Sequence, residues 1–189
     1  MITARNLGKR FGEKPVLRGV DLDVPDGGFA LVTGPNGSGK TTLLRICAGL
    51  ALPSEGRLDV GASRDRVGYL GHEPLVYREL SPLENLTLFA RLYRVERERV
   101  GMLLERFGLW DVRNDRVSTF SRGMQQRLGF CRVLLHEPQL LVLDEPTNAL
   151  DARGLDLFET VLDEPRTVVL ATHEPQRVER RATQRLAFA

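Results

Sequence analysis

Long apolar segments and an excess of one charge are both missing from this sequence of 189 residues. Its apolar runs, such as Leu140–Leu143, fall far short of the roughly 20 residues that a transmembrane helix needs. The N-terminal residues contain no apolar segment typical of a signal peptide. The 27 basic and 25 acidic residues leave a net charge of +2, which gives no reason to expect nucleic-acid binding. We therefore expect a cytoplasmic protein whose function depends on local sites.

Cysteine is also scarce, because only Cys47 and Cys131 occur. Both lie in apolar patterns with helical spacing, and neither a CxxC pair nor a disulfide framework is indicated. We expect two buried free thiols. Hydrophobic residues make up 42% and charged residues 28%, which is typical of a globular domain and excludes a disordered or fibrous chain.

Strand patterns dominate the first part of the chain, residues 1–33. Val16–Val24 alternate apolar and polar side chains before a turn at residues 25–28, which favours an antiparallel hairpin. Residues 29–33 then form a continuous apolar run that opens into a glycine-rich loop, and we expect a helix over residues 40–50. The order of strand, loop and helix is typical of phosphate-binding folds.

Two further apolar runs, Gln139–Leu143 and Thr167–Ala171, have the pattern of strands that are buried on both faces, as in parallel sheets. We therefore expect an α/β fold.

Helical patterns with interleaved Arg and Glu occupy residues 73–136. The segment Ser81–Glu84 combines a serine cap, a proline at the first helical position and a glutamate at the third, and this capping box predicts a helix that runs to about Arg94. Further helices are expected over residues 96–107 and from Ser121 onwards. This stretch is predicted to be an inserted helical subdomain.

Residues 34–41, GPNGSGKT, match the phosphate-binding loop pattern G-x-x-x-x-G-K-[ST] in its usual place between a strand and a helix. The glycines let successive N–H groups turn toward a phosphate, and the helix N-terminus adds partial positive charge. Lys40 is expected to reach the β- and γ-phosphates and Thr41 to ligate Mg²⁺. The alternative, a glycine turn with a solvent-exposed lysine, is disfavoured by this context. The predicted nucleotide-binding residues here are Gly34, Pro35, Asn36, Gly37, Ser38, Gly39, Lys40, Thr41 and Thr42.

Asp144 and Glu145 follow the apolar run of residues 140–143, at the edge of an α/β sheet that usually faces ligands. We expect Asp144 to hold Mg²⁺ through water and Glu145 to polarise the water that attacks the γ-phosphate. The alternative is that the two acids only cap the next segment. An intact phosphate loop in the same chain disfavours that alternative.

Four segments, in this order, resemble the motifs of an ABC transporter ATP-binding subunit. They are the phosphate loop, residues 120–127 (FSRGMQQR), residues 143–151 (LDEPTNALD) and residues 171–173 (ATH). The resemblance covers essentially the whole chain. The phosphate loop alone also fits a small-molecule kinase or a GTPase, but the signature segment followed by DEPTNALD excludes those classes.

The resemblance implies a P-loop NTPase core formed by residues 1–72 and 137–189. This core is expected to have a mixed, mainly parallel sheet with an N-terminal antiparallel β edge. Residues 73–136 are expected to form the helical signature subdomain.

Family resemblance also implies roles for single residues. Phe11 is expected to stack on adenine, and Ser121 and Gly123 are expected to bind the γ-phosphate of an ATP held by a second copy of the chain. A homodimer would then sandwich two ATP molecules. His173 is expected to contact the γ-phosphate and to orient Glu145 and water.

The chain departs from the common family pattern at two places. In the signature, Phe120, Arg122 and Met124 replace the usual Leu, Gly and Gln, whereas the serine and the second glycine remain. Because those two residues carry the phosphate contacts, we still expect the sandwich. The second departure is His72, which replaces the usual glutamine that joins the nucleotide site to the membrane partner, so we include it among the nucleotide-site residues.

Residues 70–74 (LGHEP), 79–86 (ELSPLENL) and 173–175 (HEP) are similar to the haem-exporter ATPase of cytochrome c maturation. This likeness implies an ATPase on the cytoplasmic face of the inner membrane, attached through separate transmembrane transporter subunits. The alternatives are the ATPase of a drug or lipid exporter and a soluble ABC ATPase of translation or DNA repair. A phosphotransferase is a third alternative, but no residues for an acceptor pocket are evident.

Overall fold

The computed structural model describes residues 1–188, and they divide into two units. The first unit comprises residues 1–69 and 139–145 together with the segment from Pro165 onwards. The second comprises residues 70–138 and 146–164. One of the peptide bonds at which the chain crosses between the units joins Glu145 to Pro146.

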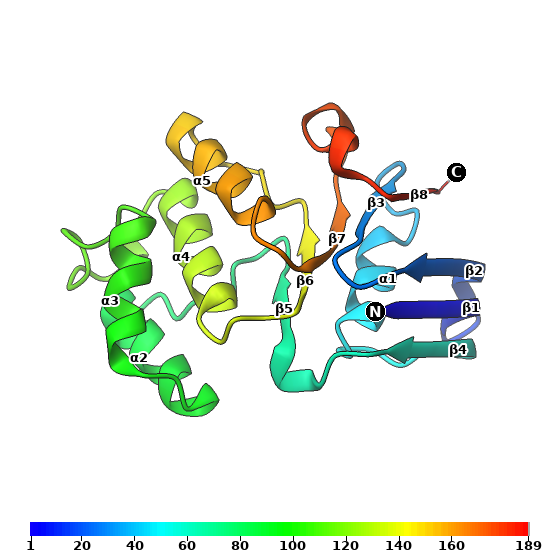
Figure 1. Ribbon diagram of the computed structural model, residues 1–189, viewed down its shortest axis with the longest axis horizontal. Helices are drawn as coiled ribbons and strands as arrows, with labels where there is room; N and C mark the ends of the chain where they lie inside the picture. Colours follow the sequence, from blue (N-terminus) through cyan, green and yellow to red (C-terminus); the bar gives the residue numbers. More distant parts are fainter. Residues whose placement is uncertain (189) are drawn as a thin grey trace. The chain divides into compact units, whose positions relative to one another are not determined.

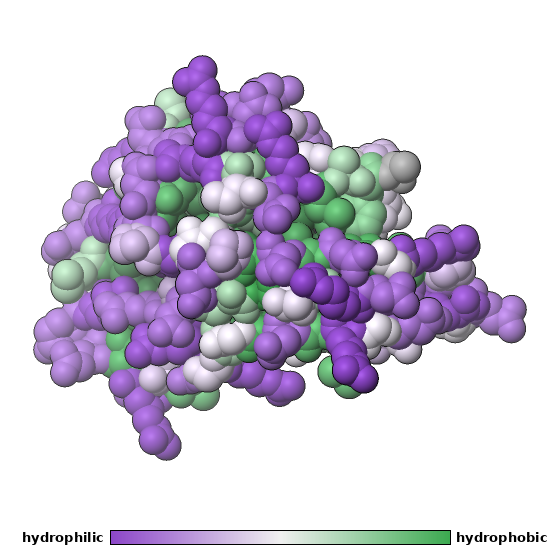
Figure 2. Space-filling view, turned by 45° about the vertical axis from the view of Figure 1, so that its right-hand side comes forward, coloured by the Kyte–Doolittle hydropathy of each residue, from purple (hydrophilic) through white to green (hydrophobic). Residues whose placement is uncertain are grey.

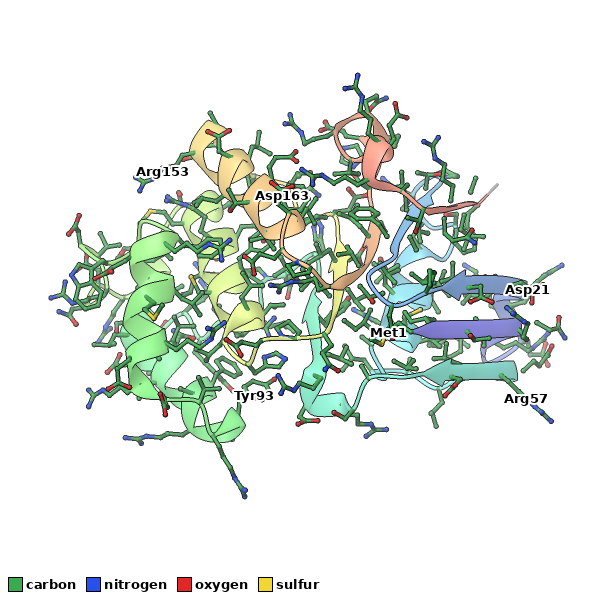
Figure 3. The ribbon with its side chains drawn as sticks, viewed as in Figure 1. Met1, Asp21, Arg57, Tyr93, Arg153 and Asp163 are labelled. Carbon is green, nitrogen blue, oxygen red and sulfur yellow. The ribbon has the colours of Figure 1, made fainter. Side chains whose placement is uncertain are left out.

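An antiparallel sheet lies in the first unit, with its three strands in the order β2-β1-β4 (Figure 1). Its strands are β1 (Ile2–Phe11), β2 (Lys14–Val24) and β4 (Glu55–Val60). Side chains alternate along the end of β2, where Val20, Leu22 and Val24 are buried and the intervening aspartates are exposed. Asp21 and Arg57 are labelled on the two outer strands in Figure 3. The antiparallel edge expected from the sequence is confirmed.

The second sheet of this unit has five strands in the order β5-β6-β7-β3-β8. These strands are β3 (Phe29–Thr33), β5 (Val67–Leu70), β6 (Leu140–Asp144), β7 (Thr167–Ala171) and β8 (Gln184–Ala187). The pairs β6·β7, β3·β7 and β3·β8 are parallel. Every residue of β6 and β7 is buried, as their continuous apolar runs predict. The expected α/β fold with a mixed, mainly parallel arrangement is confirmed.

Helix α1 (Lys40–Cys47) follows β3 after the glycine-rich loop and buries Leu43, Leu44 and Ile46. The predicted end at residue 50 was wrong. Gly49 takes a φ of +70°, and its N–H bonds to the carbonyl of Ile46 over 3.0 Å. This left-handed glycine turns the chain out of the helix.

Four helices form most of the second unit: α2 (Pro82–Tyr93), α3 (Arg97–Arg106), α4 (Arg122–Leu134) and α5 (Ala152–Leu162) (Figure 1). The predicted capping box is present at the start of α2. Ser81 Oγ accepts a hydrogen bond from the Glu84 N–H (3.2 Å), and the Ser81 N–H donates to Glu84 Oε2 (2.8 Å). Short 3₁₀ turns occur at Arg64–Arg66, Val117–Thr119, Pro175–Arg177 and Glu179–Arg181.

Helix α5 belongs to the helical unit, whereas the family resemblance implied that the whole of residues 137–189 is part of the core. The Phe130 ring of α4 lies 6.0 Å from the ring of Phe158 on α5. Arg106 of α3 pairs with Glu164 at 2.6 Å, just beyond the end of α5. These ring and ionic contacts join α5 and the residue just beyond it to the other helices of this unit.

The sequence also predicts that no helix spans a membrane and that both cysteines are buried free thiols. None of the helices within residues 1–188 combines the length and the apolar character that crossing a bilayer requires. Hydrophilic residues cover much of the face seen in Figure 2. Cys47 and Cys131 are free and buried, as predicted, and burial raises the pKa of the Cys47 thiol to about 12.

Candidate functional site

The loop between β3 and α1 requires glycine at two of its positions. Gly34 and Gly39 have φ values of +143° and +107°. A Cβ at Gly39 would lie 2.7 Å from Leu17 Cδ2, and one at Gly34 would lie 2.8 Å from the carbonyl oxygen of Phe188. Larger residues would therefore displace the loop from neighbouring strands. The backbone of the loop, with its N–H groups, therefore adopts a conformation that only glycine permits at positions 34 and 39.

Lys40 is held inside this loop. Its side chain is 7% exposed, and Nζ donates hydrogen bonds to the carbonyls of Gly34 (2.7 Å) and Pro35 (3.0 Å). Lys40 is also the first residue of α1, whose N-cap, Gly39, provides no side-chain hydrogen bond to the first turn. A positive ammonium group and the uncapped N–H groups of a helix N-terminus thus occur together, which suits a phosphate.

Two side-chain oxygens that could bind a cation lie next to the loop. Thr41 Oγ1 donates a hydrogen bond to Asp144 Oδ2 over 2.7 Å, although the two residues are far apart in sequence. Asp144 is 2% exposed at the end of β6. A hydroxyl and a carboxylate are the hard oxygen ligands that Mg²⁺ prefers, and Mg²⁺ usually completes its shell with water and phosphate oxygens. The donor set therefore fits Mg²⁺ bound together with a nucleotide.

Residues 1–188 contain no cluster of three or more His, Cys, Asp or Glu side chains that would hold a metal ion by themselves.

Glu145 is held in an unusual conformation next to Asp144. Its φ is +52°, and its N–H donates to the carbonyl of Ala171 over 2.9 Å. One carboxylate oxygen, Oε2, lies 2.8 Å from His173 Nδ1 and also accepts the His173 N–H over 3.3 Å. The Glu145 side chain is 12% exposed and that of His173 is 54% exposed. A carboxylate fixed in this way suits a base that accepts a proton from water.

The other residues singled out by sequence are placed as follows. Phe11 ends β1 with 58% of its surface exposed, and Lys9 Nζ lies 5.2 Å from its ring centroid. His72 is an exposed residue of the second unit, shortly after β5. Ser121 caps α4, because its Oγ accepts the Met124 N–H over 3.2 Å. The structure thus brings the phosphate loop, Asp144, Glu145 and His173 into the first unit.

Sequence reasoning did not single out Gln126, which is 4% exposed on α4. Its Nε2 donates to the carbonyl of Pro146 over 3.1 Å. One signal was available, since Gln126, Phe130 and Val133 share a helical face by their spacing and the last two are apolar. A polar residue on an apolar face requires a buried partner.

Comparison with known proteins shows which family this chain resembles. The family model described as "ABC transporter" matches residues 17–148. The daunorubicin resistance ATP-binding protein DrrA3 of Streptomyces coeruleorubidus is 40% identical over 90% of this chain and 60% of its own length. The lantibiotic transport ATP-binding protein SrtF of Streptococcus pyogenes is 33% identical over 95% of this chain and 82% of its own length.

Among solved structures, the dimeric post-hydrolysis state of the ATP-binding cassette MJ0796 bound to ADP and phosphate has a TM-score of 0.86 at 27% identity. That match covers 100% of this chain and 94% of the other. The chain spans 60% of the length of DrrA3 and 61% of the length of YdbJ, a relative from Bacillus subtilis.

Proposed function

Because this chain belongs to the ABC transporter family, we propose that it binds and hydrolyses ATP and drives a separate membrane-embedded partner. The observation that carries the proposal is one constellation in the first unit: Lys40 inside a glycine loop, the Thr41–Asp144 pair, and Glu145 held by His173. Phosphate binding, cation binding and a base for water are thereby supplied by neighbouring segments of one sheet. The structure of MJ0796 bound to ADP and phosphate supports this proposal.

Nucleotide binding is assigned to the loop and to Phe11. The N–H groups of residues 34–42 and the Lys40 ammonium would surround the phosphates. To do so, Lys40 Nζ would exchange its bonds to the Gly34 and Pro35 carbonyls for bonds to phosphate oxygens. The exposed Phe11 ring would stack on the adenine.

Thr41 and Asp144 would hold Mg²⁺, since their oxygens already lie in contact. The ion would neutralise charge on the phosphate oxygens. Glu145 would accept the proton of the attacking water, while His173 keeps the carboxylate in place through Nδ1 and its backbone N–H. A phosphoryl transfer of this kind depends mainly on positioning and charge, which these fixed groups supply.

We further propose that two copies of the chain form the complete site. Ser121 and Gly123 would bind the γ-phosphate of the ATP held by the other copy, because Ser121 caps a helix whose N-terminus favours an anion. The dimeric arrangement of MJ0796 supports this assembly. His72 would lie where the nucleotide site meets the membrane partner, and the ATPase would act at the cytoplasmic face of the membrane.

Two sets of observations support two different candidate cargoes. The segments LGHEP at residues 70–74 and HEP at residues 173–175 support haem export for cytochrome c maturation. The names of DrrA3 and SrtF support a second candidate, export of a drug or a lantibiotic. Haem-dependent stimulation of the ATPase in the presence of its membrane partner favours the first candidate, and stimulation by an amphiphilic drug favours the second.

The nucleotide proposal is tested by separating binding from chemistry. Lys40→Ala should lose ATP binding in calorimetry, because the charge that faces the phosphates is removed. Glu145→Gln should still bind ATP but hydrolyse it at least about 100-fold more slowly, as expected when a general base is removed. Hydrolysis at the parental rate by Glu145→Gln would show that Glu145 is not the base.

A further inference from the structure

Helix α4 approaches the loop that follows Glu145 at two backbone carbonyls, and it donates a hydrogen bond to one of them. The buried Gln126 amide donates to the carbonyl of Pro146 over 3.1 Å. Three residues earlier on the same helix, a Cβ at Gly123 would lie 2.7 Å from the carbonyl oxygen of Ala149. Residues three apart share a helix face. The same face of α4 therefore offers the loop both a hydrogen-bond donor and the space for a close approach.

The hydrogen bond from Gln126 to Pro146 affects Glu145 because the two residues Glu145 and Pro146 are adjacent in the chain. Proline has no N–H, so its carbonyl is its only backbone hydrogen-bonding group, and here that carbonyl is bonded to Gln126. A residue before proline normally adopts extended backbone, whereas Glu145 has a φ of +52°. Such a conformation persists only when the surrounding structure over-determines it. The Ala171 carbonyl holds the Glu145 N–H on one side, and Gln126 holds Pro146 on the other.

The bond between Glu145 and Pro146 is also a crossing between the two units. Gln126 and Pro146 belong to the helical unit, and Glu145 belongs to the unit with the phosphate loop. The far end of the loop is fixed in the helical unit as well, because Asp151 Oδ1 caps α5 by accepting the Gly154 N–H over 2.8 Å. Arg153, labelled in Figure 3 at the start of α5, has its guanidinium next to Gly108. Glu145 is thus covalently joined to a residue that α4 holds by a hydrogen bond.

From this geometry we infer that Gln126 is a positioning residue for hydrolysis, which transmits the position of α4 through Pro146 to the carboxylate of Glu145. The inference rests on the proposed function. Gln126 lies on the same helix as Ser121, which caps it. In the proposed dimer, Ser121 contacts the ATP that the phosphate loop of the other copy holds. The position of α4 would then depend on ATP at that second site. Through Gln126 and Pro146, so would the position of Glu145, the base of the first site.

The test uses Gln126→Met, which keeps the size and helix propensity of the side chain but removes the donor. The turnover number should fall about tenfold, equivalent to about 1.4 kcal/mol of barrier, while the affinity for ADP stays unchanged. Gln125→Met is the matched control. Gln125 donates to the carbonyl of Phe120 over 3.0 Å on the same helix and does not hold the loop. This control should keep its turnover within about twofold of the parent.

A double variant decides whether Gln126 acts through Glu145. In a Glu145→Gln background the base is already lost, so adding Gln126→Met should change the residual rate by less than about twofold. An equal fold-loss in both backgrounds would overturn the inference, as would parental turnover by Gln126→Met or an equal loss in Gln125→Met.

One further variant and the activity of the parent chain distinguish a failure of this inference from a failure of the proposed function. Gln126→Asn retains an amide that is one methylene too short to reach Pro146, and it should reproduce the loss of turnover if Gln126→Met does not fold, as judged by thermal unfolding. A parent chain that hydrolyses no ATP at all would instead contradict the proposed function, which is a different result from parental turnover in the Gln126 variants.

Discussion

Replacing Thr41 with valine tests the proposed cation site, first in the free chain and then with nucleotide and Mg²⁺ present. Valine keeps the shape and β-branching of threonine but cannot donate to Asp144, a residue that is 2% exposed and whose carboxylate accepts the Thr41 hydroxyl over 2.7 Å. A hydrogen bond to a charged group contributes about 1.5–3 kcal/mol to stability. For a chain of this size each kcal/mol corresponds to about 2–4 °C in Tm. We therefore expect Thr41→Val to lower Tm by about 3–12 °C.

The assay is thermal and urea unfolding at neutral pH, first of the free chain and then with ATP and Mg²⁺. Thr41→Ser is the control, since it retains the hydroxyl and should stay close to the parent in both conditions. Bound ligand stabilises the native state by mass action, and Thr41→Val should lose the part of that stabilisation that requires Mg²⁺. Equal unfolding curves for the parent and Thr41→Val, with and without Mg²⁺, would refute the assignment of this pair as the cation site.

The remaining predictions concern coupling, acid stability and the thiols. His72→Gln should preserve ATP binding and stimulation by the membrane partner, whereas His72→Ala should lose the stimulation; equal stimulation of both would remove His72 from the coupling path. The Ser81 N–H lowers the pKa of the Glu84 carboxyl, so the stability that this carboxylate adds is present above its ordinary value of 4.5 and is lost as pH falls below it. Glu84→Gln should therefore be less stable than the parent at neutral pH and converge with it in acid, as followed by thermal unfolding. Because burial raises the pKa of the Cys47 thiol to about 12, a maleimide reagent at pH 8 should modify Cys47 only after urea unfolds the chain, which mass spectrometry can follow.

Local patterns allowed most of the elements to be predicted. The capping box at Ser81 predicts a helix, and the continuous apolar runs of β6 and β7 predict buried strands. Each of these patterns lies within a few neighbouring residues. Strand β4 was not predicted, because only Leu58 and Val60 in it are apolar and most of its side chains are exposed. Its pairing with β1 depends on a partner far away in sequence, which no local pattern encodes.

The candidate site was predictable where a motif carries its own chemistry. The phosphate loop requires glycine at its turns, and the structure gives the steric reason at Gly34 and Gly39. The contact between His173 and Glu145 was expected only from the family resemblance, since the two residues follow different strands, β7 and β6. The bond from Gln126 to Pro146 was not expected, because spacing shows a polar residue on an apolar face but does not show which carbonyl it meets.

The most direct test of the central claim is to mix two inactive variants, Lys40→Ala and Ser121→Arg. If each site takes its phosphate loop from one copy and Ser121 from the other, every mixed dimer has one sound site. The mixture should then regain about a quarter of the parental ATPase activity. About half of the dimers are mixed, and each mixed dimer has one functional site out of two. A mixture that remains inactive, with a parental rate per molecule that does not change with protein concentration, would contradict the composite ATP site.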